Sequence, residues 1–299
     1  MTSPVIRIEN LSKYYGKHRG IEDVSFEVDR GEIFGYLGPN GAGKTTTIRI
    51  MLGFLHSYGG NVNIFDRNIK KDLLTILSRT GYLPGELSLY GNLKVSEFLE
   101  YFSKLNKKNE QSLIKDLLDR FRCEPDKKIS SLSTGNKQKV GIIQAVMNDP
   151  DLVILDEPTR GLDPLMRQEF YALLRELKNK GRTILLSSHV LTEVEKVCDS
   201  AAIVRDGKIV AVEDIHSLRT KNYKILEITS KGPLDRKKIR PLKNITGLEF
   251  MGNMMKCHLH GDIDPLLKAI GKNYIIDIES FSPGLEDIFI KFYGNKNAE

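Results

Sequence analysis

Short apolar runs separated by turn residues open the chain. The runs at 5–8 and 24–28 are rich in β-branched residues, and an apolar run at 33–37 leads into a glycine-rich segment, a pattern typical of strands and turns. From Thr45 the spacing becomes helical, and one face collects four apolar residues: Ile48, Met51, Leu52 and Leu55. The start of the chain therefore predicts a strand, a glycine loop and a helix, in that order.

The middle of the chain is amphipathic. Between 95 and 121, apolar residues recur at helical spacing in a charged background: Phe98, Leu99, Phe102, Leu113, Leu117 and Leu118. This pattern predicts a helical insertion over about 86–122, within a helical subdomain that extends to about 150.

Two β-to-helix units follow. The apolar run 152–155 precedes a helix expected from Pro164, and the run 183–186 precedes a helix expected after His189. Proline suits a first helical turn, and Gly181 suits a helix end. Repeated units of this kind predict an α/β fold built on a parallel sheet.

The pattern changes again after Val212. Three β-like runs lie at 224–229, 255–260 and 274–279, with helical stretches at about 233–241 and 264–270 and a short final helix. We place a domain boundary near Leu218, which gives a first domain at 1–218. The second domain, 219–299, is expected to be a small α+β sandwich.

The bulk composition excludes several classes of protein. Hydrophobic residues make up 40% of the 299 and charged residues 28%, which is typical of a globular chain rather than a disordered or fibrous one. No apolar run approaches the roughly 18 residues of a membrane span, and the first residues lack a signal-peptide pattern, so a cytosolic protein is expected. Three scattered cysteines, Cys123, Cys198 and Cys257, favour neither a disulfide framework nor a zinc site. The net charge of +6 suits nucleic acid, an anionic membrane or nucleotide phosphates equally well.

One segment carries a specific chemistry. Residues 38–45 fit the pattern GxxxxGK[ST] of a phosphate-binding loop, between a predicted strand and a predicted helix. Backbone N–H groups would face phosphate oxygens, Lys44 would reach the β- and γ-phosphates, and the Thr45 hydroxyl would bind Mg²⁺. The expected nucleotide-binding residues here are Gly38, Pro39, Asn40, Gly41, Ala42, Gly43, Lys44, Thr45 and Thr46. The alternative is a glycine turn with a surface lysine.

Two carboxylates end the apolar run that begins at Leu152. Asp156 would hold Mg²⁺ through water, and Glu157 would polarise the attacking water as a general base. The alternative is that the carboxylates cap the following helix. Kinases, GTPases and motor ATPases share these two features, so the choice among them needs further residues.

The segment 132–138, Leu-Ser-Thr-Gly-Asn-Lys-Gln, resembles the signature motif of the ABC ATPase family, with Thr134 and Asn136 in place of the commoner glycine and glutamine. Arg160-Gly161-Leu162-Asp163 resembles the D-loop, His189 the switch histidine and Tyr15 the aromatic that stacks on adenine. The resemblance covers roughly the first 215 residues, the length of one domain. It implies a P-loop ABC ATPase fold with an antiparallel β subdomain and a helical subdomain.

The resemblance also implies a site shared between two subunits. Two ATPase domains, here a homodimer, would sandwich two ATPs, each bound by one phosphate loop and the partner's signature segment. The residues contributed in this way would be Ser133, Thr134, Gly135, Asn136 and Asp163. His189 would position the γ-phosphate and the water, or it is an ordinary loop histidine. Tyr15 is favoured over Tyr14 by its spacing to the phosphate loop, and the alternative is that Tyr15 simply packs under the first sheet.

One position departs from the family pattern. Gly85 stands where the family usually has a glutamine that contacts Mg²⁺ and water. Glu86 beside it either ligates the metal in place of that glutamine or is a solvated surface charge.

The leading hypothesis is therefore an ATP- and Mg²⁺-dependent ATPase subunit of an ABC transporter, on the inner face of the cell membrane. The tail at 282–289, Ser-Pro-Gly-Leu-Glu-Asp-Ile-Phe, resembles the accessory region of exporter subunits. A separate transmembrane permease would be the partner, docking on 86–122, and no nucleic acid is expected. The alternatives are a soluble ABC ATPase acting on nucleic acid or ribosomes, which usually has paired cassettes, a long coiled coil or cysteine clusters, and a P-loop kinase.

Overall fold

The chain forms two compact units, Met1–Asp214 and Ile215–Glu299. The computed structural model describes residues 3–105, 111–215, 217 and 223–281, and each unit is described by itself. The boundary expected near Leu218, the short final helix and the tail motif at 282–289 lie outside the described residues.

An antiparallel sheet forms one layer of the first unit. Its strands are β1 (Ile6–Tyr15), β2 (His18–Val28), β4 (Gly59–Ile64) and the short β5 (Arg67–Asn68), in the order β2-β1-β4-β5. Strand β1 pairs with both β2 and β4. Alternate residues of β2 point inward and are buried, which is the pattern of a sheet with one face on a core.

A six-stranded sheet forms the second layer. Its order is β10-β9-β3-β8-β7-β6, and every neighbouring pair is parallel except β9 and β10. The strands are β3 (Ile33–Leu37), β6 (Thr80–Leu83), β7 (Leu152–Asp156), β8 (Thr183–Ser188), β9 (Ser200–Arg205) and β10 (Lys208–Asp214). The central strands β3, β7 and β8 are fully buried, so they are continuous apolar runs rather than alternating ones. The parallel sheet expected from the β-to-helix units is confirmed.

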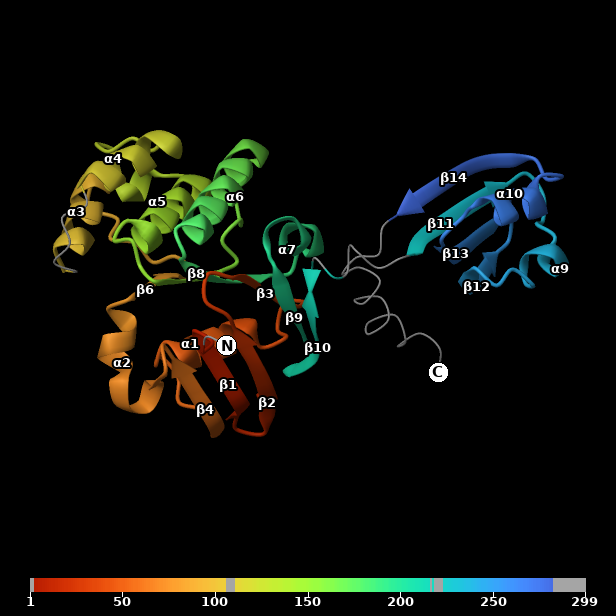
Figure 1. The fold of residues 1–299 in the computed structure, drawn as a ribbon. Helices are drawn as coiled ribbons and strands as arrows, with labels where there is room; N and C mark the ends of the chain where they lie inside the picture. Colours follow the sequence, from red (N-terminus) through yellow and green to blue (C-terminus); the bar gives the residue numbers. More distant parts are fainter. Residues whose placement is uncertain (1–2, 106–110, 216, 218–222, 282–299) are drawn as a thin grey trace. The chain divides into compact units, whose positions relative to one another are not determined.

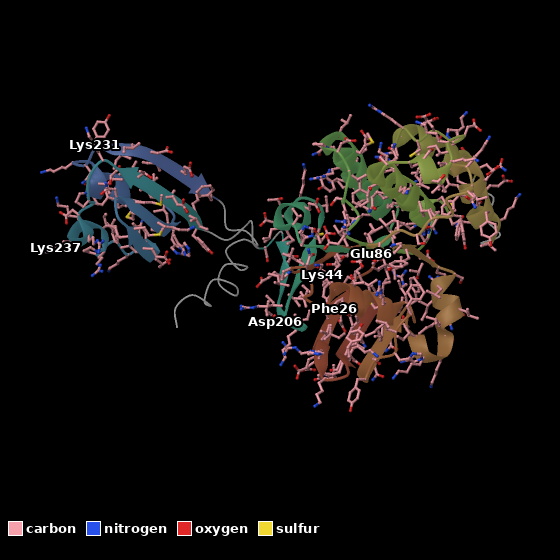
Figure 2. The ribbon with its side chains drawn as sticks, turned by 180° about the vertical axis from the view of Figure 1, so that it is seen from behind. Phe26, Lys44, Glu86, Asp206, Lys231 and Lys237 are labelled. Atoms are coloured by element: carbon pink, nitrogen blue, oxygen red, sulfur yellow. The ribbon has the colours of Figure 1, made fainter. Side chains whose placement is uncertain are left out.

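Helices cover the two faces of this sheet (Figure 1). They are α1 (Lys44–Met51), α2 (Ile69–Leu77), α3 (Val95–Leu105), α4 (Gln111–Arg120), α5 (Thr134–Val146), α6 (Pro164–Asn179) and α7 (Leu191–Val197), with a 3-10 turn at Ile129–Ser131. Helices α5, α6 and α7 lie on one face, and α1 lies between the other face and the antiparallel sheet. A buried cluster that includes Phe26, Tyr36, Ile48 and Ile154 fills that space, and Figure 2 labels Phe26 within it.

The second unit is a four-stranded antiparallel sheet with two short helices. Its order is β12-β13-β11-β14, formed by β11 (Tyr223–Ser230), β12 (Ile245–Met251), β13 (Met254–His260) and β14 (Ile275–Phe281). Helices α9 (Arg236–Ile239) and α10 (Asp264–Ile270) contribute Ile239, Leu266 and Ile270 to a core that also contains Leu226 and Ile228.

Two expectations for this unit were wrong. Strand β12 is additional to the three predicted, because Gly247 at φ 57° and a register shift between Thr246 and Glu249 interrupt its alternation. The helix predicted over 233–241 shrinks to α9, which begins after the Asp235 cap and ends before Pro241, a residue with no N–H to continue the helical hydrogen bonds. Within 3–105, 111–215, 217 and 223–281, no helix has both the length and the apolar character to cross a bilayer.

Candidate active site

A cleft of about 730 Å³ opens at the carboxyl ends of β3 and β7 in the first unit. Carboxyl ends of parallel strands are where open α/β sheets bind ligands. The lining residues come from both layers: Tyr15, Arg19, Gly20, Asn40, Gly41, Gly43, Lys44, Thr45, Thr46, Arg49, Tyr82, Pro84, Gly85, Glu86, Asp156, Glu157, Arg160 and His189. The structure thus brings together the phosphate loop, both carboxylates, Tyr15, His189 and Glu86.

The phosphate loop, residues 38–45, is held in one shape by its glycines. Gly43 has φ 102°, and a Cβ there would lie 2.5 Å from the Ile21 side chain, so no other residue fits. Gly43 is also the N-cap of α1, and no side chain caps that helix end. The first amide groups of α1 are therefore available to an anion.

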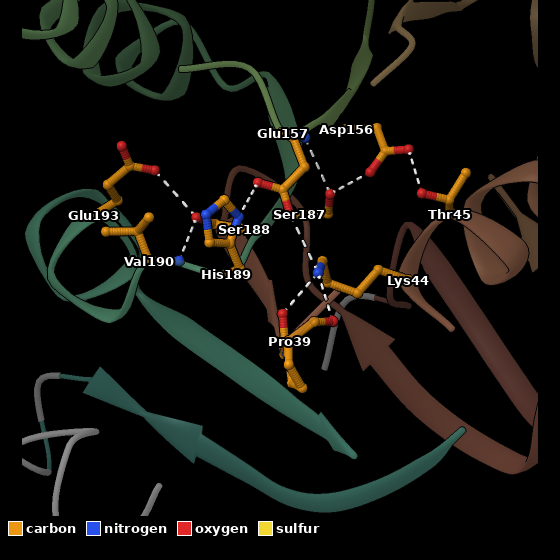
Figure 3. Close-up of polar contacts among 11 residues, drawn as sticks. Pro39, Lys44, Thr45, Asp156, Glu157, Ser187, Ser188, His189, Val190 and Glu193 are labelled. Carbon is orange, nitrogen blue, oxygen red and sulfur yellow. Dashed lines mark hydrogen bonds and ion pairs between the residues drawn. The ribbon is translucent and has the colours of Figure 1, made fainter. Parts of the chain in front are cut away.

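Lys44 lies in the floor of the cleft. Its side chain is about 6% exposed, and its Nζ donates hydrogen bonds to the carbonyls of Gly38 at 2.6 Å and Pro39 at 3.1 Å. The same Nζ lies 3.1 Å from Oε1 of Glu157 (Figure 3). A buried ammonium needs partners of this kind. Here the two carbonyls hold the Lys44 ammonium against the phosphate loop.

Glu157 stands between two cationic or donor groups. Its Oε2 is hydrogen-bonded to Nδ1 of His189 at 2.6 Å, and its Oε1 faces Lys44 (Figure 3). The residue has φ 51°, an unusual value for a side chain other than glycine. Its N–H donates to both the carbonyl and the hydroxyl of Ser187. This backbone conformation, fixed by the neighbouring strand β8, turns the carboxylate into the cleft, as a general base requires.

Asp156 and Thr45 form the second half of the site. Asp156 is 1% exposed and accepts hydrogen bonds from the Thr45 hydroxyl at 2.8 Å and the Ser187 hydroxyl at 2.5 Å. A carboxylate and a hydroxyl oxygen this close suit Mg²⁺, which takes one or two protein oxygens together with phosphates and waters. Among the described residues no three His, Cys, Asp or Glu side chains gather as a metal cage.

Tyr15, at the end of β1, lies in the wall of the cleft. Its ring is 46% exposed, its hydroxyl lies 3.4 Å from that of Thr46, and its ring edge leaves no room for a Cβ at Gly20. Tyr14 lies outside the lining and packs edge-on against Tyr58 at 5.7 Å. A half-exposed ring of this kind is available for stacking on a base.

Glu86 and Gly85 both line the cleft, and Figure 2 labels Glu86 and Lys44. Glu86 is exposed, whereas a Cβ at Gly85 would lie 3.2 Å from Oδ2 of Asp156. A side chain at position 85 would therefore point at the carboxylate of Asp156, the candidate metal ligand. Gly85 has no side chain to do so. Nothing in the contacts of Glu86 directs it to the same oxygen.

The signature segment, residues 132–138, lies outside this cleft. Ser133 and Thr134 are exposed, and the Ser133 hydroxyl caps α5 by accepting the Asn136 N–H at 3.3 Å. A Cβ at Gly135 would lie 2.4 Å from the carbonyl oxygen of Gly161, so the signature segment and the D-loop segment are packed together.

Asp163 has a structural role in this chain. Its carboxylate caps α6 by accepting the Met166 N–H at 2.9 Å, and that hydrogen bond is the main cause of its lowered pKa. The structure therefore does not bring Ser133, Thr134, Gly135, Asn136 or Asp163 to the cleft of their own chain.

Several lining residues were missed by the sequence analysis. Arg49 follows Lys44 by five residues in α1, Arg160 lies within the D-loop segment, and Arg19 precedes Gly20. Tyr82, near the end of β6, has its pKa raised to about 12 by burial and then by the charge of Asp156. The cluster of cationic residues beside a phosphate-binding motif could have predicted that the arginines line the cleft. No local sequence pattern predicts this for Tyr82.

Comparisons with known proteins agree with this geometry. Residues 21–160 match the family model described as ABC transporter. The chain is 32% identical to the bacitracin transport ATP-binding protein of Enterococcus faecalis over 97% of this chain and 96% of that protein. It is 30% identical to a Nod factor export ATP-binding protein I of Burkholderia lata over 97% of each. A solved structure described as the ATP binding subunit of an ABC transporter superposes with a TM-score of 0.68 at 33% identity, covering 72% of this chain and 92% of that one. The fold class predicted from the sequence is confirmed.

Proposed function

The chain belongs to the family of ABC transporter ATP-binding proteins, and we propose that its cleft binds ATP with Mg²⁺ and hydrolyses it through Glu157. The observation that carries the proposal is the position of that carboxylate, between Lys44 Nζ at 3.1 Å and His189 Nδ1 at 2.6 Å. Glu157 would accept a proton from the attacking water, and His189 would hold the carboxylate and the water in place.

Lys44 couples the nucleotide to the base. In this structure its ammonium is shared by two backbone carbonyls and Glu157. The same ammonium would hold the β- and γ-phosphates, so Lys44 would exchange a carboxylate partner for phosphate oxygens. Glu157 then loses a neutralising neighbour at the moment when a free carboxylate is needed. The amide groups at the start of α1 and the Tyr15 ring would hold the rest of the nucleotide.

Mg²⁺ would be held by Thr45 and Asp156, and when bound it neutralises charge on the phosphate oxygens. Ser187 donates to Asp156 at 2.5 Å and so fixes the carboxylate for this task. Glu86 is the remaining candidate for a metal contact, supported only by its place in the cleft lining.

We further propose that two subunits form the working ATPase. The signature residues Ser133 and Gly135 lie at the start of α5 and outside the cleft of their own chain. A helix N-terminus with exposed donors suits a phosphate carried by a partner subunit. A head-to-tail homodimer would bring each signature segment to the other cleft.

The relatives named for bacitracin transport and Nod factor export favour a role in export, with a separate membrane permease as partner. The chain would then act at the inner face of the membrane. The helical insertion at 86–122 would receive the permease. The second unit, with its own hydrophobic core, would brace the dimer or cap the first unit.

The experiment compares the purified chain with Glu157→Gln, measuring ATP hydrolysis and size-exclusion elution with ATP and Mg²⁺. Glu157→Gln should bind ATP, lose at least about 100-fold in hydrolysis and elute as a dimer. Glu27→Gln is the matched control, since Glu27 is an exposed carboxylate of β2 that pairs with Arg7 and does not line the cleft. The Glu27→Gln protein should behave as the unmodified chain does. A monomeric Glu157→Gln protein with full activity would refute both the catalytic assignment and the shared site.

A further inference from the structure

A second carboxylate lies close to the switch histidine and has no part in the proposal above. Glu193 lies in α7, four residues after His189, and is only 5% exposed. A buried carboxylate is costly unless hydrogen bonds and charges compensate it. Its partners therefore indicate what it does.

The first partner is the residue that precedes His189. The Ser188 hydroxyl lies 3.1 Å from Oε2 of Glu193, and the same hydroxyl oxygen accepts the N–H of Val190 at 3.0 Å (Figure 3). A serine hydroxyl has a single proton. Because that proton is donated to the carboxylate, the oxygen lone pairs are left for the Val190 N–H, and the hydroxyl cannot turn away.

The Ser188–Val190 hydrogen bond bridges His189. Ser188 and Val190 are its chain neighbours, so the hydrogen bond between them fixes the peptide units on either side of His189. Val190 is also the N-cap of α7, and its own side chain makes no capping bond. Ser188 therefore supplies the hydrogen bond that fixes this turn.

A second neighbour comes from a different helix. Burial is the main cause that raises the pKa of Tyr171 to about 12, and the charge of Glu193 contributes to the same rise. Tyr171 lies in α6, which begins at Pro164 directly after the D-loop segment, and α6 packs against α7. Glu193 thus lies where the turn that carries His189 meets the body of α6.

We propose that Glu193, acting with Ser188, is a positioning residue that holds His189 against Glu157. This inference rests on the proposed function, since it concerns the same histidine and the same base. Glu193 acts through Ser188 and the backbone of Val190, and it does not touch the reacting atoms. The Nδ1–Oε2 contact of 2.6 Å between His189 and Glu157 is the geometry that it maintains.

The test is a double-mutant cycle of Ser188→Ala with His189→Ala, measured as kcat and KM for ATP in the full chain. Ser188→Ala removes the hydroxyl and should lower kcat by about 10-fold, since a small misplacement of a catalytic group is expensive, with KM changed less than about twofold. In the His189→Ala background the same substitution should change kcat by less than about twofold, because the group it positions is gone.

A second variant guards against a folding defect. Glu193→Gln keeps the shape of the side chain but replaces the charged acceptor of the Ser188 hydroxyl with a neutral amide, so it should lower kcat by about threefold and again have no effect without His189. Glu195→Gln, on the same helix, is the matched control and should leave kcat unchanged. Thermal unfolding and ATP affinity are measured for every variant.

The outcomes separate the two proposals. The positioning role would be overturned if Ser188→Ala or Glu193→Gln lowered kcat by the same factor with and without His189→Ala. Full kcat in both single variants would overturn it as well. If instead the unmodified chain hydrolyses no ATP or Glu157→Gln is fully active, the proposed function itself fails.

Discussion

Two helices of the first unit begin in ways that invite comparison. Helix α1 begins after Gly43 with no side-chain cap, and its first residue, Lys44, is buried in the cleft. Helix α5 begins after Ser133, whose hydroxyl caps it, and its first residues face the surface. Neither helix has an acidic residue in its first turn, so neither N-terminus is neutralised locally and both favour an anion.

The difference lies in what surrounds each helix start. Around α1 the chain supplies a lysine, several hydroxyl groups, three carboxylates and a histidine within one cleft. At the start of α5 the Gly161 carbonyl of the D-loop segment lies against Gly135. One anion site is therefore complete within the chain, and the other offers donors without a catalytic group of its own. The site that we propose to be shared between two subunits would account for both helix starts.

The largest effect is expected from a substitution in the cleft at the start of α1. Lys44→Met removes a buried charge that holds two carbonyls and faces Glu157. A hydrogen bond to a charged group is worth about 1.5–3 kcal/mol, so losing contacts to two phosphates should weaken ATP binding about 100-fold. Equilibrium binding of a fluorescent ATP analogue measures this. Lys128→Met, an exposed lysine outside the cleft, should bind normally, and equal affinities would disprove the role of Lys44.

The contrast between the two helix starts also shows what sequence can predict. The phosphate loop is eight contiguous residues whose glycine positions dictate the backbone, so the whole of it could be located in advance. Asp156 and Glu157 followed from the end of an apolar run, because parallel strands present their carboxyl ends together. Their pairing with Thr45 and His189 required the resemblance to a family as well as the pattern.

Other features depend on tertiary structure alone. Arg49 and Tyr82 line the cleft because α1 and β6 lie beside it, and no local pattern marks Tyr82. Glu193 is a charged residue on a short helix, and only the structure shows that it is 5% exposed. Strand β12 was missed since Gly247 breaks its alternation. Burial and neighbours across elements decide such cases, and a sequence pattern reports neither.

A smaller effect is expected at the signature segment. A Cβ at Gly135 would lie 2.4 Å from the Gly161 carbonyl oxygen, so Gly135→Ala must push the signature and D-loop segments apart. ATP binding to a single subunit should be unchanged, while hydrolysis should fall about 10-fold through misplaced donors. Gly232→Ala, where a Cβ meets nothing within 4 Å, is the matched control. If Gly135→Ala lowers single-subunit binding as much as hydrolysis, α5 belongs to the cleft of its own chain.

The smallest effect concerns the cap itself. Ser133→Ala deletes the oxygen that accepts the Asn136 N–H at 3.3 Å, and losing an N-cap costs about 1 kcal/mol of unfolding free energy. The melting temperature of the first unit should therefore drop by about 2–4 °C, with single-subunit ATP affinity unchanged. Calorimetry with and without ATP measures both quantities.

Ser133→Thr separates the cap from the proposed phosphate contact. Threonine keeps an oxygen that can cap α5, so stability should recover, while its extra methyl group lies at the exposed surface where a partner's phosphate would bind. If Ser133 only caps its helix, Ser133→Thr restores hydrolysis together with stability. If the hydroxyl also faces a partner's phosphate, stability recovers and hydrolysis stays below that of the unmodified chain, and both helix starts then bind a phosphate, each from a different subunit's nucleotide.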